Sequence, residues 1–237
     1  MDGNGRWAKS RGIARTLGHR EGAKRVDEIV TECTRIGVKY LTLYAFSTEN
    51  WKRPSREVDL LMRLLVHYLK TMDKKLQSNY VKLVAQGNLE KLPVFAQQEL
   101  KRVMELTHFD TPSLCLNLCL SYGGRQEIVD AARTLAHKVL KGEYHPSQID
   151  EKLFGKHLYN PDFPDPDLVI RTGGQYRISN FLLWEVAYSE LYVTSECWPD
   201  FNCHSLHRAL AAYGQRNRRF GLTGEQVLSK ADNHDAH

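Results

Sequence analysis

Long hydrophobic runs are absent from this sequence. A helix that crosses a membrane needs about 18 consecutive, mostly apolar residues, and no stretch of the 237-residue chain is that long. The first residues also lack the basic start, apolar middle and small-residue cleavage site of a secretory signal. We therefore expect a cytoplasmic protein that touches membranes only peripherally.

Cysteines are few, and their spacing favours neither disulfides nor a metal site. The chain has five, an odd number, and none are spaced as Cys-x-x-Cys. Cys115 and Cys119 lie in an apolar, strand-like run, so we interpret them as reduced thiols in the core. A metal site at Cys203, His204 and His207 is disfavoured, because these residues fall on an amphipathic helical pattern.

Acidic residues are scarce in the first 25 residues. This segment holds seven lysines and arginines but only two acidic residues, an excess of five that equals the formal net charge of the whole chain, +5. A cationic segment points to an anionic partner: nucleic acid, phosphates or lipid head groups. A solvated basic surface is the plain alternative. No recognised nucleic-acid motif is present, so we expect no nucleic acid partner.

Hydrophobic periodicity predicts an α/β fold. Strand-like runs alternate with helical ones, which is typical of a single, mainly parallel β-sheet flanked by helices. We expect one domain over residues 1–222 and a flexible tail over 223–237. The expected strands are 39–46, 81–85, 114–120, 168–171 and 191–194, and the expected helices are 20–36, 57–79, 93–108, 125–140 and 201–218.

One helical segment has more hydrophobic residues than a single stripe requires. Between Val58 and Leu76 ten residues are apolar, which is wider than the face that packs on a sheet. The helix could be buried on all sides. Alternatively, one side could line an apolar cavity, with the helix at 94–106 as the opposite wall.

Three polar loops carry groups suited to a diphosphate. The first begins the chain: Gly3 and Gly5 bracket Asn4 and let backbone N–H groups approach an anion, while Arg6 can clamp a diphosphate. Asp2 beside phosphates suggests Mg²⁺ between carboxylate and phosphate oxygens. Taken alone, Gly-Asn-Gly is also an ordinary turn. The other loops, 46–53 and 171–180, each follow a predicted strand, where ligands gather in parallel sheets.

The motifs resemble those of the cis-prenyltransferases, of the bacterial undecaprenyl diphosphate synthase type, from residue 1 to about 221. They include Met-Asp-Gly-Asn-Gly-Arg-Trp-Ala-Lys at 1–9 and Tyr-Ala-Phe-Ser-Thr-Glu-Asn-Trp-Lys-Arg-Pro at 44–54. Others are Ser-Tyr-Gly-Gly-Arg at 121–125, Asp-Leu-Val-Ile-Arg-Thr-Gly-Gly at 167–174, Arg-Ile-Ser-Asn-Phe-Leu-Leu-Trp at 177–184, Tyr-Ser-Glu-Leu-Tyr at 188–192 and Trp-Pro-Asp-Phe at 198–201.

The resemblance implies an activity. Such enzymes condense isopentenyl diphosphate repeatedly onto farnesyl diphosphate with cis geometry, using Mg²⁺. The product of this type is undecaprenyl diphosphate, the lipid carrier precursor for cell-wall peptidoglycan synthesis. The growing chain lies in a hydrophobic tunnel between the sheet and two helices. The resemblance also implies a homodimer, and product release implies peripheral membrane contact.

The resemblance also implies roles for individual residues. It makes Asp2 the catalytic acidic residue and a Mg²⁺ ligand with Glu190, and gives Asn50 a part in proton removal, although an amide is a poor base. The allylic diphosphate site comprises Gly3, Asn4, Gly5, Arg6, Trp7, Arg15 and His19, with further substrate contacts from Ser47, Thr48, Glu49, Trp51 and Arg53. The isopentenyl diphosphate site comprises Arg171, Arg177, Ile178 and Ser179, and Arg219 reaches the partner subunit's site.

The sequence departs from the family pattern at two places, and one alternative function is open. Family members usually have a strand before the Met-Asp-Gly motif, so we expect that this sequence is truncated or its start misassigned. Many relatives have Glu where Gln175 stands, which leaves the role of this residue open. The alternative function is a non-catalytic regulatory subunit. Such partners lack the acidic residue at Asp2 and much of the Ser-Thr-Glu-Asn loop, whereas this chain keeps both.

Overall fold

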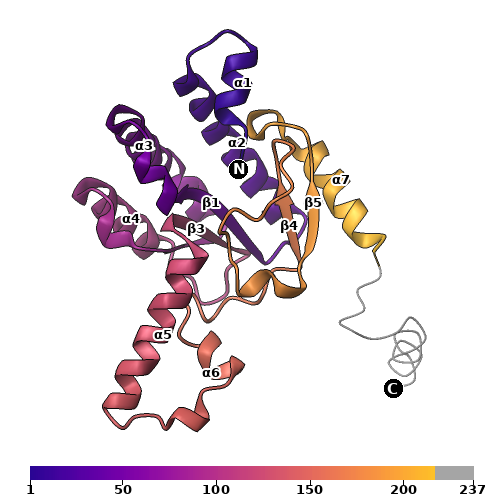
Figure 1. Cartoon of the computed structure of the whole chain (residues 1–237). Helices are drawn as coiled ribbons and strands as arrows, with labels where there is room; N and C mark the ends of the chain where they lie inside the picture. The colour runs from indigo at the N-terminus through magenta and orange to yellow at the C-terminus, as the bar shows by residue number, and fades with distance from the viewer. Residues whose placement is uncertain (217–237) are drawn as a thin grey trace.

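Helices and strands alternate along the chain, as Figure 1 shows for the computed structural model, which describes residues 1–216. The mixed α/β class is therefore confirmed. The strands are β1 (Tyr40–Ser47), β2 (Val81–Gln86), β3 (Leu114–Tyr122), β4 (Leu168–Arg171) and β5 (Glu190–Val193). The helices are α1 (Asn4–Ser10), α2 (Arg15–Arg35), α3 (Ser55–Ser78), α4 (Val94–Leu106), α5 (Gly124–Leu140), α6 (Glu151–Gly155) and α7 (Cys203–Gly214).

All strand pairs of the described chain are parallel, but they form two sheets. The larger has the order β1-β3-β2, and β4 pairs with β5. The expectation of a parallel sheet flanked by helices is confirmed, while its description as single is wrong for residues 1–216. Parallel strands carry their polar loops at one edge. The carboxyl ends of β1 and β4 therefore present the two predicted strand-end loops.

The central strand β3 explains why the larger sheet forms here. Its leucines Leu114, Leu116, Leu118 and Leu120 are at most 3% exposed, because both faces of the sheet are covered. Burying each such side chain stabilises the fold by about 1.5–3 kcal/mol. Cys119 is fully buried beside them, and all five cysteines are free thiols. The predicted core position is confirmed for Cys119, whereas Cys115 is only partly buried.

Helix α1 was not predicted, and two glycines of α2 explain how it forms. Gly3 has a φ of +103°, a left-handed conformation that glycine adopts readily, and α1 begins at the next residue. A Cβ on Gly18 would lie 2.1 Å from the carbonyl oxygen of Asn4, and one on Gly22 would lie 2.3 Å from the Asn4 Oδ1. The bare backbone of α2 thus lets α1 dock closely. The docking fixes Asp2, just before α1, near the end of β4.

A cavity of about 1820 Å³ lies between the two sheets. Its apolar walls include Leu41 and Leu43 from β1, Val169 and Ile170 from β4, and Leu61 from α3. No described residue of α4 lines it. The alternative in which α4 forms the wall opposite α3 is therefore wrong, whereas Ile29 and Cys33 of α2 and Leu61 of α3 line the cavity together with the strands.

Most of the wide apolar surface of α3 is ordinary core. Val58, Met62, Leu69, Met72 and Leu76 are at most 8% exposed and pack in the main cluster with α2, α4 and the larger sheet. No helix of the described residues is long and apolar enough to cross a membrane.

At another part of the cavity lining lies a buried carboxyl group, Glu185. Its Oε2 is buried without a hydrogen-bond partner. Burial, and then the nearby Glu127 and Asp165, raise the pKa of Glu185 to about 7. The raised pKa means that the folded protein favours the protonated, neutral carboxyl group.

This raised pKa predicts a pH dependence of stability. The contribution of Glu185 to the free energy of unfolding is fully present at pH values below its ordinary pKa. It is lost as the pH rises through about 7. From this group the free energy of unfolding should fall by about 2–3 kcal/mol between about pH 5 and about pH 8. Urea titrations at several pH values measure this fall, and the free energy of unfolding of Glu185→Gln should lack it. The exposed Glu105→Gln is the control, and equal slopes for both variants would contradict the assignment.

Candidate active site

The site is centred on the carboxylate of Asp2. Its Oδ2 lies 3.0 Å from Nη2 of Arg171, and its Oδ1 accepts the Gly3 N–H at 2.6 Å and lies 3.2 Å from Nη2 of Arg6. The backbone is equally fixed. The Asp2 N–H donates to Thr172 Oγ1 at 2.9 Å, and the Asp2 carbonyl accepts from that hydroxyl at 2.8 Å and from the Trp198 N–H at 2.9 Å. These contacts hold Asp2 at the carboxyl end of β4.

The surroundings of Asp2 keep it ionised. Partial burial acts to raise the pKa of Asp2, but hydrogen bonds from Arg171 and Arg6 outweigh it, and the pKa lies below its ordinary value. One ionised carboxylate with phosphate oxygens matches the way Mg²⁺ usually binds, through one or two carboxylates plus substrate phosphates. Asp2 therefore fits a role as the protein ligand of a Mg²⁺–diphosphate.

The loop after β4 holds the two arginines beside Asp2 in place. Arg171 also donates through Nη1 to Ser179 Oγ at 2.8 Å and to the carbonyl of Arg177. Arg6 donates to the carbonyl of Gly173, whose φ of +84° favours glycine. A Cβ on Gly173 would lie 2.5 Å from Arg6 Nη2. The glycine therefore allows the loop at the start of the chain to contact the loop after β4.

The loop after β1 forms a short 3-10 helix, Thr48–Lys52. Asn50 Oδ1 accepts the Ser47 N–H at 3.2 Å, and the Ser47 side chain accepts from the Asn50 backbone, so the two residues cap this turn. Trp51 donates to Ser121 Oγ at 2.9 Å and packs edge-on against Phe46. Asn50 lines the cavity, but its amide oxygen already holds the turn in shape.

A second group of cations surrounds Glu57, which the sequence did not single out. Glu57 Oε1 lies 3.3 Å from Arg15 Nε, 3.1 Å from Arg53 Nη1 and 3.6 Å from His19 Nε2. Burial, together with Arg53 and Arg15, lowers the pKa of His19 despite the opposing effect of Glu57. Glu57 keeps Arg15, Arg53 and the imidazole of His19 together at the cavity. Its place in the first turn of a helix, four residues after the predicted site residue Arg53, was the signal for it.

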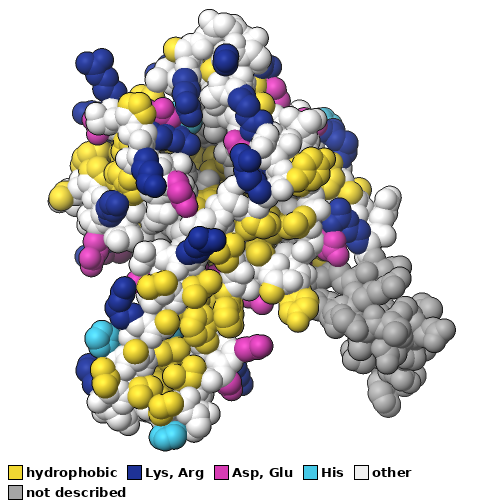
Figure 2. Space-filling model, in the orientation of Figure 1, with side chains coloured by type: hydrophobic (Ala, Val, Ile, Leu, Met, Phe, Trp, Pro, Cys, Tyr) yellow, Lys and Arg dark blue, Asp and Glu magenta, His cyan; other side chains and the backbone are white. Residues whose placement is uncertain are grey.

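The structure brings most of the predicted residues to one face. Figure 2 shows Lys and Arg side chains around a hollow in this face. The cavity is lined by Asp2, Gly3, Asn4, Gly5, Arg6, Arg15, His19, Ser47, Glu49, Asn50, Arg53, Arg171, Arg177, Ile178 and Ser179. Trp7 turns outward instead and donates to Asp200 at 2.7 Å. Arg219 lies outside the described residues.

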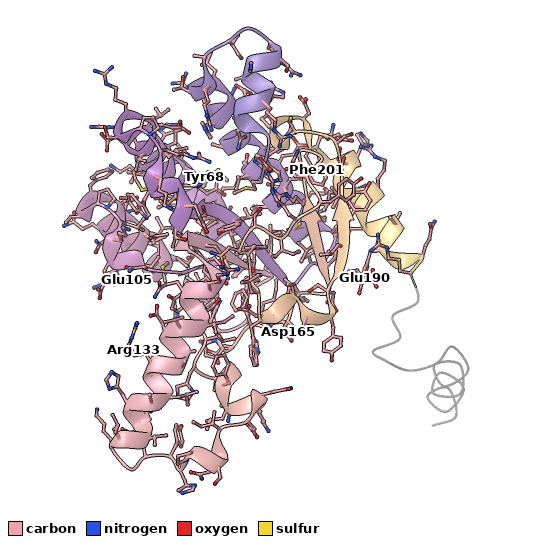
Figure 3. The ribbon with its side chains drawn as sticks, in the orientation of Figure 1. Tyr68, Glu105, Arg133, Asp165, Glu190 and Phe201 are labelled. Atoms are coloured by element: carbon pink, nitrogen blue, oxygen red, sulfur yellow. The ribbon has the colours of Figure 1, made fainter. Side chains whose placement is uncertain are left out.

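Glu190 is not near Asp2 within the chain. It pairs with Leu168 at the amino end of the β4–β5 ladder, whereas Arg171, which contacts Asp2, lies at the other end. Three residues of a strand separate the two ends by roughly 10 Å. Glu190 instead binds Arg216 at 2.6 Å, beside the end of α7 (Figure 3). Within one chain Asp2 and Glu190 do not meet, and the assignment of Glu190 to Mg²⁺ stays a prediction.

No group of three or more His, Cys, Asp or Glu side chains in residues 1–216 could hold a metal ion. His207 lies 2.5 Å from Glu32, and Cys203 donates to Glu28 at 3.1 Å. These contacts join α7 to α2. The helical interpretation of Cys203, His204 and His207 is thereby confirmed.

Comparison with known proteins gives consistent matches. A family model described as "Putative undecaprenyl diphosphate synthase" matches residues 1–221. An isoprenyl transferase of Clostridium tetani is 49% identical over 221 residues, covering 93% of this chain and 86% of that protein. A farnesyl-diphosphate-specific ditrans,polycis-undecaprenyl-diphosphate synthase of Vibrio cholerae is 44% identical over 233 residues, 98% of this chain and 93% of that protein.

A solved structure matches equally broadly. The crystal structure of lavandulyl diphosphate synthase from Lavandula x intermedia, in complex with dimethylallyl diphosphate, aligns with a TM-score of 0.90 and 38% sequence identity. The match covers 93% of this chain and 95% of that one.

Proposed function

Since this chain belongs to the undecaprenyl diphosphate synthase family, we propose that it lengthens farnesyl diphosphate by repeated cis-addition of isopentenyl diphosphate. The observation that carries the proposal is Asp2, held ionised between Arg6 and Arg171 at a cavity of about 1820 Å³. The charged end of the cavity suits a diphosphate group, and the apolar walls that β1 and β4 form suit the hydrocarbon tail of the substrate.

The allylic diphosphate is the group that leaves during each addition. Its carbon–oxygen bond breaks, and negative charge grows on the diphosphate. Arg6, Arg15 and Arg53, with the N–H groups that follow Gly3, are already oriented and stabilise that charge as it develops. We assign Asn4, Gly5, His19, Ser47, Thr48, Glu49 and Trp51 to the same substrate, and Trp7 to the rim of its site.

The isopentenyl diphosphate is proposed to bind on the other side of Asp2. Arg171, Arg177, Ile178 and Ser179 form this part of the cavity. A guanidinium can bind two phosphate oxygens at once, and Arg171 already contacts Asp2 and Ser179. The two diphosphates would therefore lie next to each other, as bond formation between their carbon chains requires.

We propose that Asp2 holds Mg²⁺ together with substrate phosphate oxygens. Bound Mg²⁺ neutralises charge on the departing diphosphate. Asp2 is ready for this role because its carboxylate stays ionised and its backbone is fixed by Thr172 and Trp198. Asn50 is proposed to shape the turn over the reacting carbons and to orient the isopentenyl unit for loss of its proton, which the departing diphosphate can accept.

Further proposals follow from the family. The chain would be a homodimer in which Arg219 completes the partner's site, and the product would serve as a lipid carrier for cell-wall synthesis. A non-catalytic subunit is disfavoured, because Asp2 and the Ser-Thr-Glu-Asn loop are both present, and Asp2, Ser47, Glu49 and Asn50 line the cavity.

The proposed reaction is tested by following labelled isopentenyl diphosphate into an organic extract. We expect transfer of label only when farnesyl diphosphate and Mg²⁺ are both present. A chelator should stop it, and added Mg²⁺ should restore it. Equal label in the extract without the allylic primer would contradict the proposal.

A further inference from the structure

Asn180 joins three separate loops of the site. Its side-chain Nδ2 donates to Glu49 Oε1 at 2.9 Å, in the loop after β1. Its Oδ1 accepts the Arg125 N–H at 2.8 Å, and its backbone carbonyl accepts the Gly124 N–H at 2.8 Å. Asn180 itself lies at the end of the loop after β4. One residue therefore links the ends of β1, β3 and β4.

These contacts fix which way the amide group of Asn180 points. Its oxygen faces an N–H donor and its nitrogen faces a carboxylate, so the reverse orientation would set donor against donor and oxygen against oxygen. The two N–H groups that it satisfies belong to the first turn of α5, which has no partners of its own for them. The loops are also tightly packed here. A Cβ on Gly123 would lie 2.8 Å from Asn180 Nδ2.

The backbone at Asn180 gives a second reason for its position. Asn180 has a φ of 62° and Ser179 a φ of 52°, both left-handed. Asparagine tolerates this conformation better than most residues, whereas serine adopts it at a cost. A strained residue persists only when its surroundings hold it in place. Through Asn180 the turn keeps Ser179 Oγ 2.8 Å from Arg171, whose guanidinium holds Asp2.

We propose that Asn180 is a positioning residue that locks the isopentenyl diphosphate loop to the loop after β1. The lock consists of its hydrogen bonds to Glu49 and to the start of α5. The inference rests on the proposed function of the site. Asn180 acts through Ser179 and Arg171, which contact the substrate, so its loss should lower kcat and raise the KM for isopentenyl diphosphate together.

The test exchanges the donor and the acceptor of the hydrogen bond between Asn180 and Glu49. Asn180→Asp keeps the acceptor for the Arg125 N–H and tolerates a left-handed φ, but it sets a carboxylate against Glu49. We expect kcat/KM to fall roughly ten- to a hundredfold. Glu49→Gln in the same chain then supplies an N–H that can donate to the new aspartate. Glu49→Gln should therefore lower activity in the wild-type background and raise it severalfold in the Asn180→Asp background.

Two control variants make the outcome decisive. Asn202→Ala removes a helix cap of the same kind, from α7, and should leave both constants near wild type. Asn180→Gly keeps the φ but has no side chain, so it should lose activity without any gain from Glu49→Gln. Should Asn180→Asp fail to fold, unchanged kinetics of Asn180→Gly would overturn the inference.

The remaining outcomes separate the two proposals. If the wild-type protein turns over and Glu49→Gln changes activity by the same factor in both backgrounds, the lock does not exist. If the wild-type protein itself fails to elongate farnesyl diphosphate, the proposed function fails first.

Discussion

Asp2→Ala should lower kcat by roughly a thousandfold or more, because it removes the group that engages Mg²⁺ and helps the diphosphate to leave. The fold should persist, since the backbone of Asp2 keeps its hydrogen bonds to Thr172 and Trp198. Substrate should still bind, because the surrounding arginines remain. Turnover and thermal unfolding of the purified variant measure the two effects.

The matched control is Asp2→Asn, which keeps the size and the acceptor for the Gly3 N–H but lacks the charge. It should be almost as inactive as the alanine variant. A folded Asp2→Ala protein with near-normal kcat would refute the role of this carboxylate.

Arg171→Ala should lower kcat/KM for isopentenyl diphosphate by at least about a hundredfold, because one guanidinium holds both Asp2 and Ser179. Lysine should not replace it, since a single ammonium group cannot make both contacts in the same geometry. Steady-state kinetics with each substrate varied separately test this.

Arg133→Ala is the control for a lost arginine, because Arg133 pairs with Asp130 on the exposed side of α5 (Figure 3). Its kinetics should match wild type. Full activity of Arg171→Lys would show that only a positive charge, and not the forked contact, is needed at this position.

The strands were predictable because their hydrophobic pattern is local. The run around β3 is apolar apart from Asn117 and Ser121, and the observed strand extends the predicted one by only two residues. Helix α1 was not predictable in the same way. It depends on the close approach of Asn4 to Gly18 and Gly22, and no periodicity within seven residues shows that contact.

The same distinction applies to the site. Asp2, Arg6 and Arg171 stand in motifs that the sequence displays directly. Glu57 and Asn180 were missed because their roles come from partners in other loops; Asn180 and Glu49 are 131 positions apart. Glu190 stands in a plain motif, but the strand register places it at the amino end of β5, away from Asp2 of the same chain, so its role at Mg²⁺ stays a prediction.

The position of the cavity could not be predicted from the sequence either. An over-wide apolar helix is compatible with a cavity wall and with core packing, and the two differ only in which elements pack on its faces. In the structure the larger sheet, α2 and α4 cover most of that surface of α3, and the space opens between β1 and β4 instead.

The most direct measurement is the size of the product made from farnesyl diphosphate and labelled isopentenyl diphosphate with Mg²⁺. The label should appear in polyprenyl diphosphates many units longer than farnesyl diphosphate, with cis double bonds in every added unit, and Asp2→Ala should yield none. Label that stays water-soluble with the folded wild-type protein, or products with trans double bonds in the added units, would contradict the account.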